Sequence, residues 1–401
     1  MARTSMILRT AGAAMFLFAM HLSLHAADAA WEIKGTYPAP PPVDAAKLAK
    51  APRTGTPRNI ILLIGDGMGQ GALTLASLYA YGAPGKLTLD QFPVCGLART
   101  ASANSTVTDS AASGTALAGG YKTNNGMIGK TPDKVSRKSF AALARESGRS
   151  IGIMTTDALT GATPAAFLAH ADHRSQAEKI AADLSAAGSM ILIGSDPKPF
   201  LPKKDGGRRA DNRNLLAELQ KAGYREAATP EALKQLPANI PAYGFVPDWS
   251  NTTLLSRFAS AAFEKLNANP KGFFLMIEGH YPDKGGHGNN PDYSVNGVLM
   301  NNFLAKAALD FALQHPDTLV VVTADHETGG ISAAPNKANP RKPHIHYMTK
   351  NHTGAPVGIY AFGPGADRFN AVIENTDIPK TFADFWRIKL DLPEKEIPPK
   401  R

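Results

Sequence analysis

Residues 59–69 read N-I-I-L-L-I-G-D-G-M-G, an apolar run that passes directly into a glycine-rich turn. The apolar residues of Asn59–Ile64 are continuous rather than alternating, which is typical of a parallel strand covered on both faces. The turn holds Asp66 between two glycines, and glycine lets a ligand approach the backbone closely. The stretch therefore predicts a buried parallel strand with a ligand-binding carboxylate at its carboxyl end.

The same pattern recurs along the chain in the apolar runs Ser150–Thr155, Met190–Gly194, Gly272–Ile277, Thr318–Thr323 and Val357–Phe362. Helical patterns lie between the runs, at Ser175–Ala187, Asn214–Gly223, Thr253–Asn267 and Asn296–Gln314. This alternation predicts an α/β fold with a mostly parallel central sheet and helices on both faces. We expect two irregular segments, a basic loop at Lys198–Arg213 and a surface insertion at Ile331–Lys350.

The composition is that of a folded protein, because 43% of the 401 residues are hydrophobic. The formal charge is +9, from 43 basic and 34 acidic residues, and the basic residues are scattered in small clusters. We interpret this charge as a mild attraction for anions and expect no nucleic-acid specificity. Cys95 is the single cysteine, so no internal disulfide can form, and we expect it to be a small core residue.

Residues 1–29 have the features of a signal peptide. Arginines precede an apolar stretch, Ala11–Leu24, that is too short to span a bilayer, and Ala27-Asp28-Ala29 fits a small-x-small cleavage site. We therefore expect a periplasmic or secreted protein with no membrane anchor after signal removal. Residues 30–57 are proline-rich and predict an extended N-terminal arm, and we expect one catalytic domain over residues 58–401.

Carboxylate and histidine side chains gather at the predicted strand ends. The run Gly272–Ile277 continues as E-G-H-Y-P-D-K-G-G-H, the run Thr318–Thr323 continues as A-D-H, and H-T-G precedes Val357. Acids and imidazoles are the usual ligands of zinc and of harder divalent ions, so we expect a metal centre there. Its candidate ligands are Asp66, Glu278, Asp283, His287, Asp325, His326 and His352.

Ser110 lies in V-T-D-S-A-A-S-G-T, residues 107–115, which has no large side chain except Val107. A predicted helix over residues 108–117 places Ser110 near its amino terminus, where free amides and the helix dipole favour an anion. Serine alone is a weak nucleophile, and the missing G-x-S-x-G and H-E-x-x-H motifs disfavour an α/β-hydrolase and a zincin protease. The acid inside the turn at Asp66 also disfavours dinucleotide binding. We therefore interpret Ser110 as a serine activated by metal.

These motifs resemble those of the alkaline phosphatase family. The resemblance rests on G-D-G-M-G, T-D-S-A-A-S, A-T-P-A-A, E-G-x-x-x-D-x-x-x-H, T-A-D-H and H-T-G in this order, and it extends from about Asn59 to Ala366. It implies an alkaline-phosphatase-like domain that hydrolyses small phosphate monoesters through a phosphoserine intermediate. It also implies two zinc ions, one magnesium ion and a homodimer.

The resemblance further implies a role for each candidate residue. The first zinc ion would be held by Asp283, His287 and His352. The second would be held by Asp66, Asp325 and His326, and would also bind Ser110. The magnesium ion would be held by Asp66, Thr163 and Glu278. The phosphate would be contacted by Asp109, Arg174 and Lys284.

The chain departs from its bacterial relatives at Gly161, where they have an acid two residues before the threonine of A-T-P. Without that acid we expect a weak magnesium site, unless His344 or His346 from the segment 331–350 fills the gap. Two other functions stay open: a phosphodiesterase or related ester hydrolase on the same fold, and a metal- or phosphate-binding protein without catalysis. A sulfatase is disfavoured because neither Cys95 nor Ser110 lies in a C/S-x-P-x-R motif.

Overall fold

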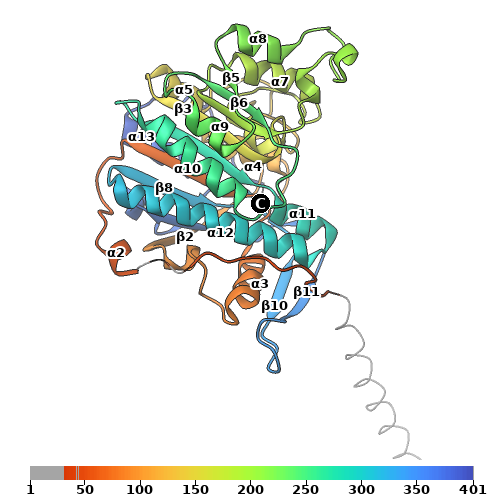
Figure 1. Ribbon diagram of the computed structural model, residues 1–401, viewed down its shortest axis with the longest axis vertical. Helices are drawn as coiled ribbons and strands as arrows, with labels where there is room; N and C mark the ends of the chain where they lie inside the picture. The colour runs from red at the N-terminus through yellow and green to blue at the C-terminus, as the bar shows by residue number, and fades with distance from the viewer. Residues whose placement is uncertain (1–30, 42, 44, 401) are drawn as a thin grey trace, which may run out of the picture.

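The computed structural model describes residues 31–41, 43 and 45–400, so the expected signal peptide at residues 1–29 lies outside the described residues. A central sheet flanked by helices makes up the body of the molecule (Figure 1). Within the described residues, no helix is long and apolar enough to cross a membrane.

A ten-stranded sheet has the strand order β14-β2-β13-β8-β1-β7-β3-β4-β6-β5. Its strands are β1 (Asn59–Gly65), β2 (Val94–Arg99), β3 (Ser150–Ala158), β4 (Ile191–Ser195), β5 (Arg225–Glu226), β6 (Ala242–Phe245), β7 (Phe273–Gly279), β8 (Thr318–Thr323), β13 (Val357–Phe362) and β14 (Val372–Glu374). β1 pairs in parallel with β7 and β8, and every residue of these three strands is buried. The predicted mostly parallel α/β sheet is therefore confirmed.

β13 is the exception, because it runs antiparallel to both its neighbours, β8 and β2. We expected a parallel strand from its continuous apolar run, and this was wrong. All six residues of β13 are buried. A continuous apolar run therefore indicates that both faces of a strand are covered, but it does not indicate the direction of the strand. The fully described segment between β8 and β13 contains short strands and no helix. The connection does not cross the sheet as a helix, and β13 starts from the end of the sheet at which β8 finishes, so it runs antiparallel to β8.

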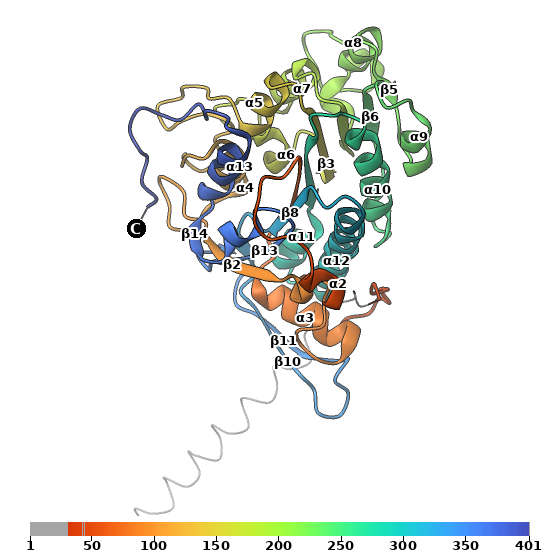
Figure 2. The ribbon, with the colours of Figure 1, turned by 90° about the vertical axis from the view of Figure 1, so that its left-hand side faces the viewer.

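Helices cover both faces of the sheet. α10 (Leu254–Asn267) and α12 (Pro291–Gln314) pack on one face, while α4 (Ser110–Gly119), α5 (Phe140–Glu146) and α13 (Asp377–Trp386) lie on the other. Figure 2 shows these two layers on opposite sides of β3 and β8. The remaining helices of the described residues are α2 (Ala45–Ala49), α3 (Gln70–Tyr81), α6 (Ala162–Ala166), α7 (Ala177–Ala186), α8 (Leu215–Lys221), α9 (Pro230–Gln235) and α11 (Tyr281–Gly288). Short 3-10 helices lie at Leu89–Gln91, Lys198–Phe200, Lys203–Asp205 and Ala366–Phe369.

α12 begins at Pro291, earlier than the expected start at Asn296. The side chain of Asn290 accepts hydrogen bonds from the backbone N–H groups of Asp292 and Tyr293, which caps the helix. Proline is tolerated in a first helical turn, where its missing N–H has no intrahelical partner anyway. The first turn is polar, so the apolar periodicity begins only after it.

The segment Ile331–Lys350 is irregular only in part, because it also contains two strands that we did not expect. β10 (Ile331–Ala334) and β11 (His344–Tyr347) form an antiparallel hairpin, which extends away from the central sheet in Figure 1. Burial alternates along both strands, so neither shows the continuous apolar run that predicted the central strands. The N-terminal arm packs here, with the Trp31 ring 5.3 Å from the His346 ring.

Cys95 is exposed, so the prediction of a core cysteine was wrong. It lies on β2, where Cys95, Leu97 and Arg99 are exposed. β2 lies beside the edge strand β14, and the sheet is not covered on this side of β2 as it is at its centre.

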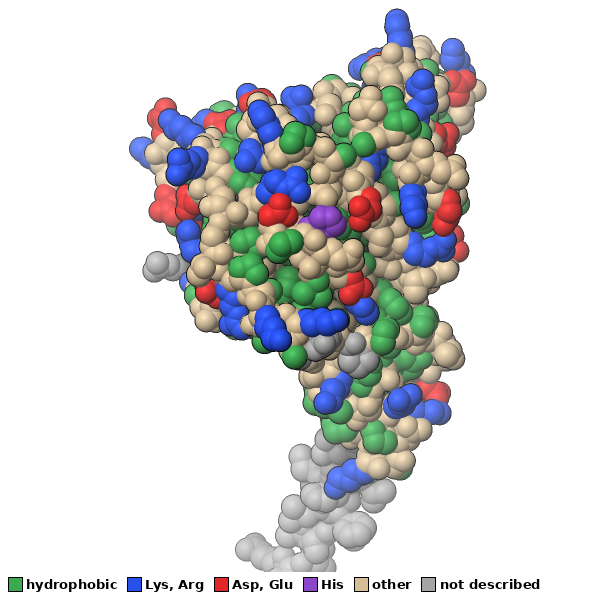
Figure 3. All heavy atoms as spheres, turned by 60° about the vertical axis from the view of Figure 1, so that its left-hand side comes forward, with side chains coloured by type: hydrophobic (Ala, Val, Ile, Leu, Met, Phe, Trp, Pro, Cys, Tyr) green, Lys and Arg blue, Asp and Glu red, His purple; other side chains and the backbone are tan. Residues whose placement is uncertain are grey.

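The surface carries charges of both signs. Acidic and basic side chains are interspersed on the face drawn in Figure 3. Several basic residues pair with a neighbouring acid, as in Arg257–Glu231 at 2.7 Å and Lys306–Asp310 at 2.7 Å. Part of the positive charge is thus paired locally.

Candidate active site

Three adjacent strands bring the acidic candidates to one edge of the sheet. β1 lies between β7 and β8, and Ile64 is in register with both Glu278 and Thr323. Asp66 follows β1 and Asp325 follows β8, so their carboxylates emerge beside Glu278 at the carboxyl ends of parallel strands. The backbone N–H of Gly67 donates to Asp325 Oδ1 at 3.1 Å, which joins the two loops.

Asp283, His287 and His352 form a first cluster. α11 places Asp283 and His287 one turn apart, and the pairing of β12 (His352–Thr353) with β9 (Glu327–Thr328) brings His352 beside them. His287 Nε2 lies 3.1 Å from His352 Nε2 and 3.4 Å from Asp283 Oδ2, and His352 Nε2 lies 3.5 Å from Asp283 Oδ1. Ligand atoms about 2.1 Å from a tetrahedral zinc ion are about 3.4 Å apart, so this spacing fits one zinc ion.

Both histidines of the first cluster present Nε2 to it. His287 Nδ1 donates to the carbonyl oxygen of Lys350 at 2.6 Å, and His352 Nδ1 donates to that of Thr108 at 2.9 Å. Because a carbonyl oxygen only accepts, Nδ1 carries the hydrogen and Nε2 keeps a lone pair. Hydrogen bonds of this kind orient metal-ligating histidines.

Asp66, Asp325 and His326 form a second cluster, in which all three residues are buried. His326 Nε2 lies 3.4 Å from Asp66 Oδ1 and 3.2 Å from Asp325 Oδ2. Ser110 Oγ lies 3.2 Å from the same Nε2 atom. These four atoms are close enough together to ligate a single ion.

Three buried atoms near these clusters have no hydrogen-bond partner among the described residues: Asp66 Oδ1, Asp325 Oδ2 and Thr163 Oγ1. Buried polar atoms are nearly always satisfied, so these three indicate a missing ligand. Burial raises the pKa of Asp66, and the negative charges of Asp325 and Asp283 raise it further. A divalent cation would stabilise the ionised carboxylates and satisfy the free atoms.

Ser110 is the first residue of α4, at the helix terminus where we expected it. Asp109 caps this helix, because its Oδ1 accepts the backbone N–H of Ala112 at 2.9 Å. Ser113 Oγ donates to the carbonyl oxygen of Asp325 at 2.6 Å, which ties α4 to the second cluster. A Cβ on Gly114 would lie 3.2 Å from Ala166 Cβ, so the small residues of this stretch let α4 pack closely on α6.

Arg174 lies beside the cap of α4. Its Nη1 is 3.6 Å from Asp109 Oδ2, and its side chain is 38% exposed. The backbone N–H of Arg174 donates to the Gly126 carbonyl at 2.7 Å, and the N–H of Gly126 donates to Asp109 Oδ2 at 2.9 Å. The loop at Gly126 thus connects the arginine to the helix start, while the guanidinium stays accessible to an anion.

Glu278 lies among three polar residues that sequence reasoning missed. Thr155 Oγ1 donates to Glu278 Oε2, and His280 Nδ1 lies 2.9 Å from Asp66 Oδ2. Burial raises the pKa of Glu278 to about 7; the charge of Asp157 adds to this rise and that of His280 opposes it. His280 could have been found, because it lies inside the E-G-H-Y-P-D motif. Asp157 and Thr155 lie at the end of β3, where no motif singled them out.

The space that a side chain at position 161 would occupy is taken by the side chain of Asp157. A Cβ on Gly161 would overlap Asp157 Oδ2 and lie 2.9 Å from the Ala158 carbonyl oxygen. The carboxylate of Asp157 therefore takes the space that an acidic side chain at 161 would use. The alternative that His344 or His346 fills this gap was wrong, because both lie on β11, where His346 packs against Trp31.

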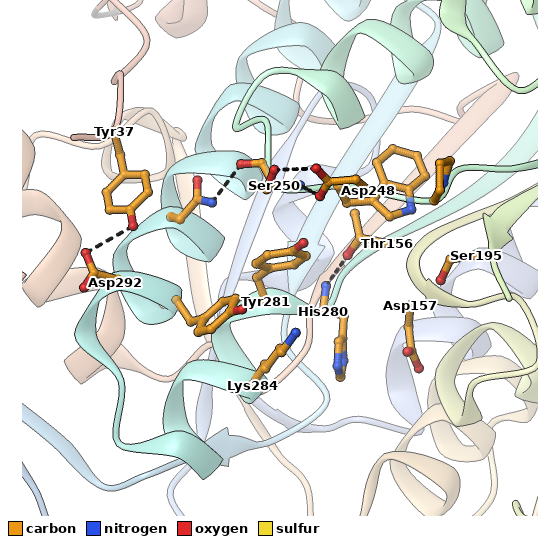
Figure 4. Close-up of a pocket in the computed structure, with 14 residues that line it drawn as sticks. Tyr37, Thr156, Asp157, Ser195, Asp248, Ser250, His280, Tyr281, Lys284 and Asp292 are labelled. Carbon is orange, nitrogen blue, oxygen red and sulfur yellow. Dashed lines mark hydrogen bonds between the residues drawn. The ribbon is translucent and has the colours of Figure 1, made fainter. Parts of the chain in front are cut away.

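A cavity of roughly 760 Å³ lies next to the site. Its lining includes Asp157, His280 and Lys284. Figure 4 shows these three side chains on one side of the cavity and Tyr37 and Asp292 farther away. Lys284 Nζ lies 4.6 Å from the centre of the Tyr293 ring and 5.6 Å from that of Tyr281. Cation–π contacts of this kind hold the ammonium group inside the cavity.

Comparisons with known proteins agree on one family. The family model described as alkaline phosphatase matches residues 57–344. Alkaline phosphatase 4 of Bacillus subtilis (strain 168) is 30% identical over 408 residues, which cover 80% of this chain and 87% of that protein. The solved structure of alkaline phosphatase from the Antarctic bacterium TAB5 has a TM-score of 0.76 and 30% identity, covering 84% of this chain and 99% of that one. A variant of the TAB5 enzyme with Mg bound in its M3 site has a TM-score of 0.75 and 29% identity, with the same coverage.

Proposed function

The chain belongs to the alkaline phosphatase family and hydrolyses phosphate monoesters, and we propose that it does so through a phosphoserine formed on Ser110. The observation that carries this proposal is the 3.2 Å contact between Ser110 Oγ and His326 Nε2 at the amino terminus of α4. The hydroxyl lies beside ligand atoms suited to a cation and at a helix end suited to an anion.

The two histidine-containing clusters would each hold one zinc ion. The first would use Asp283, His287 and His352, and the second Asp66, Asp325 and His326 together with Ser110. The spacing of the Nε2 and carboxylate atoms and the free atoms of Asp66 and Asp325 support this assignment. When bound, zinc supplies positive charge that stabilises a serine alkoxide and a departing oxygen. A third divalent ion would be held by Asp66, Thr163 and Glu278, the residues that the family resemblance assigns to magnesium.

Ser110 would act as the nucleophile. Its Oγ forms a bond to phosphorus while the bond from phosphorus to the ester oxygen breaks. The hydroxyl proton of Ser110 passes to solvent, and the departing oxygen takes a proton from water and leaves as the alcohol. Water then attacks the phosphorus of the phosphoserine, releases inorganic phosphate and restores the Ser110 hydroxyl.

Arg174 would hold the phosphate, because a guanidinium donates to two oxygens at once. Asp109 would position Arg174, since it both caps α4 and lies 3.6 Å from the guanidinium. Lys284 would approach the phosphate only by leaving the rings of Tyr281 and Tyr293.

Acid trapping tests the phosphoserine directly. We expect radioactive phosphate to label the enzyme at acidic pH, and peptide mapping to place the label on Ser110. A label on another residue would reject the assignment. Rates on 4-nitrophenyl phosphate and on its bis-ester separate the monoesterase from the phosphodiesterase alternative, and we expect the monoester to be the faster substrate.

We further propose that the chain is exported and acts as a homodimer on small phosphate monoesters. The composition of residues 1–29 supports export, and the family resemblance supports the dimer. N-terminal sequencing of the mature protein and light scattering measure these two properties.

A further inference from the structure

The neighbourhood of Glu278 contains two side chains that can complete a metal site. Gly161 has an ordinary backbone φ of −56°, so glycine is not needed there for conformation. It is needed for space, because any Cβ at this position would overlap the carboxylate of Asp157. In this conformation, the Asp157 carboxylate takes the place of a side chain at 161.

His280 contributes a second side chain to this neighbourhood, because its ring lies beside Asp66. Its Nδ1 atom lies 2.9 Å from Asp66 Oδ2, and its backbone N–H donates to Thr156 Oγ1 at 2.8 Å, which holds the residue in position. Two ligand atoms about 2.1 Å from an octahedral ion and at right angles are about 3.0 Å apart, so this contact has the length of a shared coordination edge. Ligand atoms of Asp66, His280 and Asp283 all lie within 4.8 Å of one another.

A free polar atom indicates that a ligand belongs here. Thr163 Oγ1 has no partner among the described residues, and Thr163 is only 1% exposed. The backbone N–H of Asp157 donates to Thr155 Oγ1 at 2.9 Å, and that hydroxyl donates to Glu278 Oε2, so Asp157 is linked to the Glu278 carboxylate through Thr155. In Figure 4, the side chains of His280 and Asp157 extend in the same direction along the cavity.

We propose that the third metal site of this protein is completed by His280 as a direct ligand and by Asp157 as the carboxylate that orients bound water, and that it therefore prefers zinc to magnesium. Imidazole suits zinc, whereas magnesium prefers oxygen ligands and water. Asp66, Thr163 and Glu278 remain the oxygen ligands. This inference rests on the metal centre of the proposed function.

Metal counting tests the proposal without an activity assay. The full chain is stripped with a chelator, dialysed against equal free zinc and magnesium, and analysed for both metals by mass spectrometry. We expect about three zinc ions per chain and little magnesium in the wild type. We expect His280→Ala to keep about two zinc ions and to bind zinc at the third site more weakly by a factor on the order of ten or more.

Two variants keep this test decisive. His280→Gln retains a polar side chain if His280→Ala is poorly folded, and it should lose the third zinc equally. His315→Ala is the matched control, because His315 caps the far end of α12 and packs on Phe311, and it should leave the metal count unchanged. Asp157→Asn should lower the affinity of the third site for its ion while leaving two zinc ions bound.

A wild-type protein that holds magnesium as its third ion, with a zinc-to-magnesium ratio that His280→Gln does not change, would overturn the proposal. That failure is distinct from failure of the proposed function. Acid trapping reports the phosphoserine separately, so Ser110 would still be labelled if only the third site were misassigned.

Discussion

Asp109 and Arg174 are joined through the start of helix α4: Asp109 Oδ1 accepts the N–H of Ala112 at 2.9 Å, while Asp109 Oδ2 lies 3.6 Å from Arg174 Nη1. One carboxylate therefore stabilises the helix that carries Ser110 and faces the arginine that would bind phosphate. Because the two oxygens have different partners, substitutions can separate their effects.

Replacing Arg174 by alanine should weaken catalysis without abolishing it. Arg174 would bind phosphate oxygens and transfer no proton, so we expect a loss of about 2–4 kcal/mol in transition-state stabilisation, measured from kcat/KM. Inhibition by inorganic phosphate should weaken too. Arg174→Lys should recover only part of the loss, because an ammonium group cannot grip two oxygens in one plane. Unchanged phosphate inhibition in Arg174→Ala would show that the arginine does not bind the anion.

Two variants of Asp109 should differ in their free energy of unfolding, although both remove the same negative charge. Asp109→Ala removes the helix cap and should lower the free energy of unfolding by about 1 kcal/mol. Asp109→Asn keeps an oxygen for the Ala112 N–H but loses the acceptor of the Gly126 N–H, so its stability should lie between those of Asp109→Ala and the wild type. Both variants lose the carboxylate that faces Arg174, so both should change phosphate inhibition. Equal melting temperatures for the two variants would contradict the capping role.

Replacing Ser110 by alanine should remove the phosphoenzyme and leave the zinc ions bound. The first and second clusters each supply three protein ligands without Ser110, so the hydroxyl is not required to hold the metal. Acid trapping and zinc analysis of the same sample measure both properties. Loss of zinc in Ser110→Ala would mean that the serine is mainly a ligand.

Removing the metals should destabilise the protein, because the buried carboxylates of Asp66 and Asp325 would face each other without a cation. A ligand present at a thousand times its Kd stabilises the folded state by about 4 kcal/mol per site. We expect prolonged chelation to lower the melting temperature and abolish activity, and zinc to restore both. Full activity after verified metal removal would reject the metal-dependent mechanism.

The strands that flank the site could be predicted because each is buried on both faces. β1, β7 and β8 have continuous apolar runs, and the residues that follow them lie together at one edge of the sheet as expected. β5 has two residues and β14 has three, so neither is long enough to show a periodic pattern. The direction of β13 depends on how the chain returns to the sheet, which an apolar run does not encode.

The metal clusters could be predicted only where a motif marked them. His280 was missed although it lies between Glu278 and Asp283, because its contact with Asp66 depends on how the loops after β1 and β7 pack. Asp157 was missed for a different reason. Asp157 lies near the end of β3, where no motif marks it. Its position beside Gly161 depends on the conformation of the backbone between β3 and α6.

A buried ion pair away from the active site predicts how stability changes with pH. Lys122 is 3% exposed; its Nζ lies 3.1 Å from Glu374 Oε2 and donates to Asn375 Oδ1 at 2.7 Å. Burial alone would raise the pKa of Glu374, but its hydrogen bond to Arg99 and the charge of Lys122 lower it below its usual value. A carboxyl whose pKa is lowered by folding stabilises the protein above its unfolded pKa of about 4.3, and this contribution disappears as the pH falls through the folded value.

Glu374→Gln should therefore be less stable than the wild type at pH 7, and the difference should shrink towards pH 3. We expect about 2 kcal/mol at pH 7, between the values typical of exposed and of fully buried pairs, because the glutamate is only partly buried. Urea unfolding at both pH values measures the difference. Glu231→Gln is the matched control, since its pair with Arg257 is exposed on both sides and should contribute less than about 0.5 kcal/mol. Adding Lys122→Met should recover part of the loss, because the double variant no longer buries a positive charge that has lost its carboxylate partner. A deficit of Glu374→Gln that stays constant from pH 7 to pH 3 would show that the carboxylate's charge is not its cause.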